Sequence, residues 1–226
     1  MDAPLLEIRG VKKYYPVKKV RGGEDIAVKA VDDIDLVVNQ GEIVGLVGES
    51  GCGKSTLGKS ILKLHDITGG QILFHGEDIT HYNENKMRPL RKKIQIIFQD
   101  PYASLNPKKK VEQLVAAPLE VEGKYSKEEK RQKVVDILKE VGLSEKYLEK
   151  FPHEMSGGQR QRVVIARALI NDPELVICDE PVSALDVSVR SQVLNLLKDL
   201  QKKRGLTYIF ISHDLSVVEY LCDRVA

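Results

Sequence analysis

Nine consecutive residues, at positions 48–56, carry the chemistry that is easiest to interpret in this chain. They spell G-E-S-G-C-G-K-S-T, which fits the phosphate-binding pattern G-x-x-x-x-G-K-[ST]. Glycines let successive backbone N–H groups point into one hollow, and the positive end of a helix starting near Gly53 faces it too. Lys54 adds a cation for the β- and γ-phosphates, and the Ser55 hydroxyl suits Mg²⁺, which prefers oxygen ligands. The predicted nucleotide-binding residues are Gly48, Glu49, Ser50, Gly51, Cys52, Gly53, Lys54, Ser55 and Thr56.

Polar side chains also follow three apolar runs that we predict to be strands. They are Gln99 after residues 94–98, Asp179 and Glu180 after residues 175–178, and His213 after residues 207–211 and Ser212. In an open α/β sheet, ligands bind at the carboxyl ends of the strands, where all of these residues would lie. Asp179 is suited to hold Mg²⁺, Glu180 to accept a proton from an attacking water, and His213 to bond the γ-phosphate. A single Gln or His at a strand end is more often structural, but their coincidence with the phosphate loop favours a nucleotide hydrolase.

Composition narrows the class of protein. The chain has 226 residues, enough for one large domain or two small ones, and 35 basic against 33 acidic residues give a net charge of +2. This balance lacks the strongly basic surface of a nucleic-acid-binding protein. No apolar run approaches the roughly 20 residues that span a bilayer, and the N-terminus lacks a signal-peptide pattern. We expect a cytoplasmic protein that can dock on a membrane protein. The three widely spaced cysteines indicate neither a disulfide framework nor a metal site.

Hydrophobic periodicity places these residues on alternating strands and helices. We predict strands at residues 5–11, 28–38, 42–47, 71–74, 94–98, 175–178 and 207–211. We predict helices after the phosphate loop, with an apolar stripe of Leu57, Ile61, Leu62 and Leu64, and at residues 111–117, 126–142, 143–150, 156–170 and 189–203. A basic loop is expected at residues 17–25. The pattern favours short antiparallel strands near the N-terminus, a parallel α/β sheet, and an inserted helical segment between about residues 99 and 155.

A second glycine-containing helix start lies at residues 155–162, which read M-S-G-G-Q-R-Q-R. The start of a helix offers free N–H groups and a positive dipole end. Because the phosphate loop already provides one such anion site, the second is best explained as serving a partner chain. The alternative interpretation is that Ser156 is simply an N-cap and that its glycines permit close packing.

At this point the sequence resembles the ATP-binding-cassette (ABC) ATPases. Residues 155–159 are similar to the family's signature L-S-G-G-Q, with Met155 in place of the usual leucine, and residues 183–186 match its S-A-L-D loop. The resemblance implies ATP and Mg²⁺ as cofactors and two chains packed head-to-tail around two ATP molecules. It implies that the catalytic residues are Glu180, His213 and Gln99, and that Tyr15 stacks on adenine, with Tyr14 a weaker candidate. It implies that the partner's ATP is contacted by Ser156, Gly157, Gly158 and Gln159, and that Asp186 makes a dimer contact. The implied Mg²⁺ ligands are Ser55, Gln99 and Asp179.

The resemblance also implies a fold. We expect an α/β protein of the ABC ATPase fold, with a P-loop NTPase core containing a parallel sheet, an N-terminal antiparallel β subdomain and an inserted α-helical subdomain. Residues 1–226 would form a single ABC ATPase domain. Its core and β subdomain would comprise residues 1–98 and 160–226, and its helical subdomain with the signature would comprise residues 99–159. Since the family's core continues past the equivalent of Ala226, we expect the chain to be C-terminally truncated.

A narrower resemblance concerns residues 99–107, Q-D-P-Y-A-S-L-N-P, and His153-Glu154 before the signature. These are similar to the ATPase subunits of oligopeptide, dipeptide and nickel importers. The implied function is ATP hydrolysis that powers import of peptides or a related small solute. The implied partners are a second ATPase subunit, identical or paralogous, transmembrane permease subunits and, indirectly, an extracytoplasmic solute-binding protein. The chain would then sit peripherally on the cytoplasmic side of the cell membrane, and no nucleic acid would be involved.

Other functions stay open at this stage. The chain could serve an importer of nickel or another solute. DNA-repair and chromosome-organising ATPases of the superfamily place long coiled coils between the phosphate loop and the signature, and this sequence contains no sustained heptad there. Translation-associated ATPases of the superfamily carry two cassettes in one chain. A non-hydrolysing regulatory or structural subunit would have lost Glu180 or His213, and both are present.

Overall fold

The computed structural model of the chain describes residues 3–18 and 26–226, which divide into two compact units. The first unit comprises the described residues up to Arg91 together with Thr207–Ala226, and the second comprises Lys92–Leu206. Helix α2 (Glu84–Lys93) contains the boundary between them. The phosphate loop and His213 belong to the first unit, whereas Gln99, Glu180 and the signature belong to the second.

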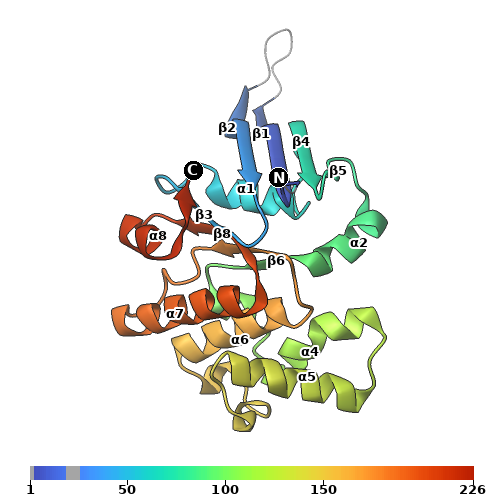
Figure 1. The fold of residues 1–226 in the computed structure, drawn as a ribbon, viewed down its shortest axis with the longest axis vertical. Helices are drawn as coiled ribbons and strands as arrows, with labels where there is room; N and C mark the ends of the chain where they lie inside the picture. Colours follow the sequence, from blue (N-terminus) through green and yellow to red (C-terminus); the bar gives the residue numbers. More distant parts are fainter. Residues whose placement is uncertain (1–2, 19–25) are drawn as a thin grey trace. The chain divides into compact units, whose positions relative to one another are not determined.

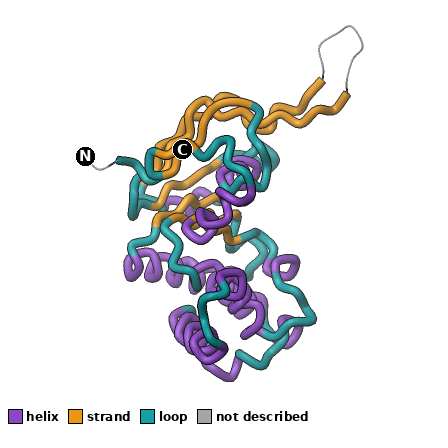
Figure 2. The backbone as a smooth tube through the Cα atoms, turned by 90° about the vertical axis from the view of Figure 1, so that its right-hand side faces the viewer, coloured by secondary structure: helices purple, strands orange, loops and turns teal. Residues whose placement is uncertain are grey.

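An antiparallel sheet forms the N-terminal part of the first unit. Its strands lie in the order β2-β1-β4-β5 (Figure 1), with bounds Leu6–Lys18 for β1, Ile26–Val38 for β2, Gly69–Phe74 for β4 and Glu77–Asp78 for β5. Figure 2 shows β1 and β2 as a long paired ribbon in orange. Leu6 and Ile8 are buried on the same side of β1, as the alternation predicts.

Parallel strands follow in the same unit. Strand β3 (Ile43–Val47) pairs with β8 (Thr207–Ser212) on one side and with β9 (Arg224–Val225) on the other. All six residues of β8 are buried, as expected for a parallel strand covered on both faces. Helix α1 (Lys54–Ile61) follows β3 through the phosphate loop, and α8 (Leu215–Leu221) follows β8. The two loops that carry candidate site residues thus leave adjacent strands.

The second unit is mainly helical. Its strands β6 (Ile94–Ile97) and β7 (Leu175–Asp179) are parallel. Its helices are α3 (Pro101–Ser104), α4 (Val111–Glu122), α5 (Lys127–Glu140), α6 (Gly157–Leu169) and α7 (Val187–Arg204), with 3₁₀ turns at Glu145–Tyr147 and Pro152–Glu154. Helix α6 contacts α3, α4, α5 and α7, and nine of its thirteen residues are buried. Figure 1 shows α6 between α7 and the pair α4 and α5. The helix that starts with the signature is therefore the central element of this unit.

The predicted elements are present, with differences at several boundaries. The capping box at Ser126 is confirmed, since Ser126 Oγ accepts from the Glu129 N–H and the Glu129 carboxylate accepts from the Ser126 N–H. The apolar stripe of α1 is wrong at Leu64, which is 47% exposed because the helix ends at Ile61. Of the expected loop at residues 17–25, Val17 and Lys18 belong to β1, and the rest lies outside the described residues.

Helices α2, α3 and α8 were not predicted, and α4 is longer than predicted. Helix α2 contains Pro89, and α4 continues through Pro118 to Glu122 although its pattern indicated an end at Ala117. In both, tertiary packing outweighs the cost of an interior proline, since Met87 and Leu119 are fully buried. Within residues 3–18 and 26–226, no helix is both long and apolar enough to cross a membrane.

Candidate functional site

The phosphate loop joins β3 to α1 in the way its sequence predicts. Gly53 is the N-cap of α1, with a φ of 100°, and it provides no side-chain cap. A Cβ atom at this position would lie 1.8 Å from the backbone oxygen of Ala30. Only glycine therefore fits here, on grounds of both backbone conformation and space. The consequence is a helix start without a side-chain oxygen in front of its first N–H groups, which suits an external anion.

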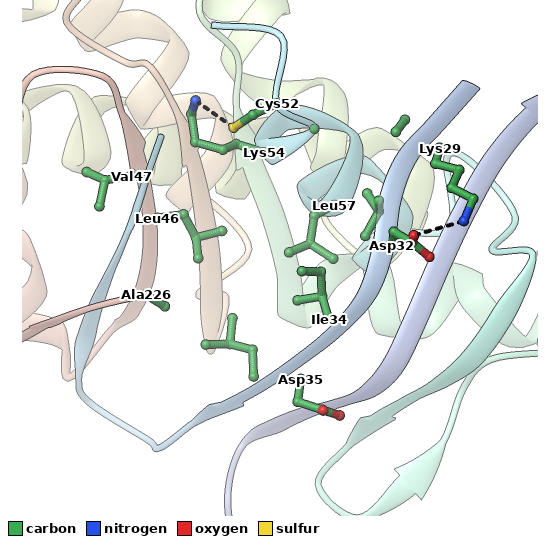
Figure 3. A pocket seen from close by; sticks show the side chains of 14 residues that line it. Lys29, Asp32, Ile34, Asp35, Leu46, Val47, Cys52, Lys54, Leu57 and Ala226 are labelled. Carbon is green, nitrogen blue, oxygen red and sulfur yellow. Dashed lines mark hydrogen bonds and ion pairs between the residues drawn. The ribbon is translucent and has the colours of Figure 1, made fainter. Parts of the chain in front are cut away.

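Lys54 is the cation of this loop. Its Nζ donates to the backbone oxygens of Gly48, at 2.6 Å, and of Glu49, at 2.7 Å, and lies 3.4 Å from Cys52 Sγ. Figure 3 shows the last of these contacts as a dashed line. The ammonium group is held over the loop by exposed contacts that phosphate oxygens can replace. A cation above a glycine-rich helix start, followed by the hydroxyl of Ser55, fits a bound polyphosphate and its Mg²⁺.

A pocket of about 460 Å³ adjoins the loop at Cys52, Gly53 and Lys54 (Figure 3). Its other walls are mainly apolar and come from β2, β3 and α1, with Ile34, Leu36, Leu46, Val47 and Leu57 among the lining residues. At the β2 wall, Lys29 Nζ lies 3.2 Å from an oxygen of Asp32. The pocket is therefore mainly apolar toward β2, β3 and α1 and carries Lys54 at the loop.

His213 leaves the sheet beside the phosphate loop. Val47, the last residue of β3, pairs with Ser212, the last residue of β8. Gly48 and His213 therefore follow directly after paired residues of two parallel strands. This register agrees with the prediction that both residues lie at the same edge of the sheet.

Tyr14 and Tyr15 lie on β1, opposite Lys29 and Val28 of β2. The Tyr14 hydroxyl donates to the carboxylate of Asp32, and this hydrogen bond raises the pKa of Tyr14. The same hydrogen bond, together with one from Lys29, lowers the pKa of Asp32. Tyr15 instead makes an edge contact with His65, with ring centroids 6.1 Å apart.

The neighbouring stretch of β2, from Lys29 to Val31, borders the start of α1. Both tyrosines thus come from strands next to the phosphate loop. The role of Tyr15 as the ring that stacks on adenine stays a prediction.

In the second unit, Gln99 and Glu180 are in direct contact. The Gln99 Nε2 donates to Glu180 Oε2 at 3.0 Å and lies 3.4 Å from Ser183 Oγ. The Ser183 hydroxyl in turn donates to the backbone oxygen of Glu180 at 3.1 Å. The structure therefore brings together two of the three predicted catalytic residues. Ser183 was not predicted as a partner of Glu180, although it lies in the S-A-L-D run.

Glu180 also has an unusual backbone conformation, with a φ of +47°. A non-glycine residue in this region costs about 1–2 kcal/mol. Such strain persists only where the surrounding structure enforces it, and it is frequent at functional sites. Here it turns the chain immediately after the buried Asp179, at the end of β7. The strain supports a functional role for Glu180.

The strand register explains why Gln99 meets Glu180. Ile97 of β6 pairs with Cys178 of β7. Gln99 lies two residues after Ile97, and Glu180 lies two residues after Cys178, so the two side chains leave the paired strands at the same level. Asp179 is 5% exposed and ends β7. In the part of the chain that the structure describes, no group of three or more His, Cys, Asp or Glu side chains is arranged to hold a metal ion. A Mg²⁺ ion here would depend on oxygens of the nucleotide as well as on protein oxygens.

The N-terminus of α6 is capped by side chains of its own first turn. Ser156 Oγ accepts from the Gln159 N–H at 3.4 Å, and Gln159 Oε1 accepts from the Ser156 N–H at 3.0 Å. The Gln159 Nε2 also donates to the Tyr147 hydroxyl at 2.9 Å. These bonds form a capping box.

The glycines of this helix start pack closely against the S-A-L-D segment and α7. A Cβ on Gly158 would lie 2.4 Å from Val189 Cγ1, and one on Gly157 would lie 3.5 Å from Leu185. The structure thus places the signature beside Asp186, which is exposed at the start of α7. Both observations agree with the alternative interpretation, in which Ser156 is an N-cap and the glycines permit close packing. The role of these residues toward a partner's ATP stays a prediction.

Comparison with protein families gives one match that covers more than half of the chain. The profile described as "ABC transporter" matches residues 31–183. Curated relatives include the oligopeptide transport ATP-binding protein AppF of Bacillus subtilis, which is 51% identical over 98% of this chain and 68% of its own length. The dipeptide transport ATP-binding protein DppF of Escherichia coli is 49% identical over the whole of this chain and 67% of its own.

Solved structures agree with these relatives. The ATP-binding cassette MJ0796, in a dimeric post-hydrolysis state bound to ADP and phosphate, has a TM-score of 0.82 and 31% identity, covering 95% of this chain and 90% of its own. CbiO1 of Clostridium perfringens, part of the transporter complex cbiONQ, has a TM-score of 0.82 and 32% identity, covering 98% and 83%. The expected cassette fold, with an antiparallel β subdomain, an α/β core and a helical insertion, is confirmed.

Proposed function

Since this chain belongs to the ABC transporter family as an ATP-binding subunit that hydrolyses ATP, we propose that it powers the import of peptides through a membrane transporter. The observation that carries the proposal is the identity of about half of all residues, over nearly the whole chain, with ATP-binding proteins of oligopeptide and dipeptide transport. The segment at residues 99–107 is consistent with this proposal, since it resembles the ATPase subunits of oligopeptide, dipeptide and nickel importers.

ATP is bound by the first unit. Residues 48–56 enclose the phosphates, Lys54 contacts the β- and γ-phosphates, and the Tyr15 ring stacks on adenine. Ser55 provides an oxygen to Mg²⁺, which neutralises phosphate charge when bound. Gln99 and Asp179 stay sequence-based predictions for further Mg²⁺ ligands.

Hydrolysis depends on Glu180. Its carboxylate orients a water and accepts a proton from it, and its strained backbone and the Gln99 hydrogen bond fix its position. The Gln99 Nε2 could instead donate to a γ-phosphate oxygen, and its Oε1 is the atom that would face a bound Mg²⁺ ion. His213, beside the phosphate loop in the sheet register, donates to the γ-phosphate. These assignments rest on the geometry within each unit and on the family's motif order.

The partners follow from the second unit. Ser156, Gly157, Gly158 and Gln159 contact the ATP of a second ATPase chain, identical or paralogous, and Asp186 contacts that chain. The dimeric state of MJ0796 supports this arrangement. Residues 100–107 dock on transmembrane permease subunits, which receive peptide from an extracytoplasmic binding protein. The chain then works peripherally on the cytoplasmic side of the cell membrane.

The helical segment bears on the alternative of a DNA-repair ATPase. Between the phosphate loop and the signature, the longest helix is α5 with 14 residues, and no long coiled coil interrupts the chain. This observation favours transport over that alternative.

The test is peptide-dependent growth. Cells that lack this protein and cannot make leucine would be supplied with leucine only as a tripeptide, and complemented with wild type, Glu180→Gln or the matched control Glu120→Gln, which changes an exposed carboxylate on α4. We expect growth with wild type and Glu120→Gln and none with Glu180→Gln. Uptake of nickel instead of peptide in the same cells, or growth with Glu180→Gln, would contradict the proposal.

A further inference from the structure

Two arginines of α6 support the segment that follows Gln99. Arg160 and Arg167 are seven residues apart, so they project from one face of the helix at a spacing of two turns. The guanidinium carbon of Arg160 lies 3.9 Å from the ring centroid of Tyr102, and Arg167 Nη1 donates to the backbone oxygen of Ser104 at 2.5 Å. Helix α3 is thereby held to α6 at both of its ends.

Arg160 is fixed from the signature side. It lies four residues after Ser156, to whose backbone oxygen its own N–H donates at 3.0 Å. Arg160 is buried, with 7% of the residue exposed, and its Nε donates to the backbone oxygen of Pro152 at 2.5 Å. Any displacement of the first turn of α6 therefore displaces this guanidinium.

Tyr102 is fixed from the Gln99 side. Its N–H donates to Asp100 Oδ1 at 2.7 Å, so the tyrosine and the cap of α3 move as one piece. Tyr102 lies three residues after Gln99, whose side chain contacts Glu180. Tyr102 is 63% exposed as a residue, and Arg160 lies over one face of its ring.

If Arg160 served only to fill space, its buried guanidinium would be destabilising. Nη1 of Arg160 is buried and has no hydrogen-bond partner within the described part of the chain. An aliphatic side chain would fill the same space without an unpaired donor. What arginine adds is a planar cation that stacks on an aromatic ring while its Nε bonds a carbonyl. The arrangement favours a contact that transmits position over one that merely fills space.

We propose that Arg160 is a positioning residue that couples the start of α6 to Gln99 through the ring of Tyr102. Arg167 anchors the far end of α3, so a shift at the signature is passed to Tyr102 and on to the Gln99–Glu180 contact. The inference rests on the proposed function, in which a partner's ATP engages residues 156–159. It adds a residue outside that contact set, through which engagement of the signature and the position of Gln99 depend on each other.

The experiment uses the absence of tryptophan from these 226 residues. Tyr102→Trp in the full-length protein places an emission probe under Arg160, and difference spectra against the Tyr102 parent remove any emission from outside the 226 residues. The non-hydrolysable nucleotide Mg–AMP-PNP would be added while sedimentation records dimer formation. We expect an emission shift that accompanies the dimer. Arg160→Lys, which keeps the charge and loses the plane, should abolish the shift. Arg162→Lys, on the same helix and bonded to Val141 instead, should retain it.

Each outcome decides the matter. A dimer without an emission shift, or a shift that survives in Arg160→Lys, overturns the coupling. Absence of a nucleotide-dependent dimer in every variant contradicts the proposed function itself, and the coupling falls with it.

A second measurement does not depend on the probe. Tyr102→Leu alters an exposed ring and is not expected to unfold the protein. Arg160→Lys and Tyr102→Leu should each lower peptide-stimulated hydrolysis by about threefold to tenfold, and the double variant should lose no more than either alone. Additive losses would indicate that the two residues act separately.

Discussion

Helices α1 and α6 both have glycine at or next to their first residue, but their starts are capped in opposite ways. At α1 the N-cap is Gly53, with positive φ and no side-chain cap, and the nearest cation, Lys54, bonds only to the loop itself. At α6 the N-cap is Ser156, whose capping box with Gln159 already occupies backbone donors. The first helix start therefore has no side-chain cap, whereas the second is capped within its own chain.

The difference shows that a glycine-rich helix start does not by itself indicate an anion-binding site. Both helices have a positive dipole end, which favours an anion equally in each. Of the two, only α1 lacks a side-chain cap, and its first residue, Lys54, adds a cation, so we expect it to bind phosphate in the isolated chain. Anion binding at α6 needs something further, which in our proposal is a second ATPase chain that brings its own ATP.

The largest expected effect separates binding at α1 from chemistry at Glu180. Glu180→Gln keeps the shape of the side chain and removes the basic oxygen, so we expect ATP hydrolysis to fall by about 10²–10⁴-fold while ATP affinity stays near wild type. Steady-state phosphate release and equilibrium nucleotide binding measure the two quantities. Glu120→Gln is the control for loss of an exposed carboxylate. Phosphate release close to wild type would remove Glu180 from the catalytic role.

Lys54→Ala, unlike Glu180→Gln, should weaken ATP binding itself. It removes the charge that contacts the phosphates, so we expect ATP affinity to fall by about tenfold to a hundredfold, the loss of one or two charged hydrogen bonds. Isothermal titration with Mg-ATP measures the affinity. Lys59→Ala, in the last turn of the same helix, controls for loss of a lysine from α1. Equal affinities of the Lys54 and Lys59 variants would mean that α1 binds anions by its dipole alone.

Much of the site at α1 could be predicted because its signals are local. A buried strand, a fixed glycine pattern and a helix follow one another in the sequence, and the structure keeps them in that order at residues 43–61. The capping box at Ser126 was predicted for the same reason, since all of its atoms come from four consecutive residues.

Features that depend on distant parts of the chain were missed. The positive φ of Glu180 follows from its surroundings and has no sequence signal, and the Gln99 contact joins residues 81 positions apart. The Arg160–Tyr102 stack likewise depends on tertiary packing. Interior prolines in α2 and α4 led the sequence pattern to omit or shorten helices that packing stabilises.

Alanine at the two glycine positions sharpens the comparison. At Gly53 the new Cβ would meet backbone, 1.8 Å from the Ala30 oxygen, and at Gly158 it would meet the side chain of Val189. We expect Gly53→Ala to cost at least about 3 kcal/mol of unfolding free energy and Gly158→Ala about 1–2 kcal/mol. Denaturant unfolding measures both. The companion change Val189→Ala should recover most of the second loss and none of the first.

The smallest expected effect on stability is at Ser156, and it distinguishes the two interpretations of α6. Ser156→Ala removes a cap and should cost about 0.5–2 kcal/mol. Ser156→Asp keeps the cap and adds a negative charge at the helix start, so the isolated chain should be as stable as wild type or slightly more so. If residues 156–159 meet the γ-phosphate of a partner's ATP, that same charge should repel it and prevent the nucleotide-dependent dimer.

The matched control for this last change is Ser126→Asp. Ser126 is the N-cap of α5 and forms the same kind of capping box, with Glu129, but it lies outside the signature. Sedimentation with Mg–AMP-PNP should therefore find a dimer with Ser126→Asp and none with Ser156→Asp, at equal unfolding free energy. Dimers from both variants would mean that Ser156 is only a cap, as the bonds within this chain already allow. Loss of the dimer from Ser156→Asp alone would show that a helix start closed by its own side chains can still be opened by a partner's phosphate.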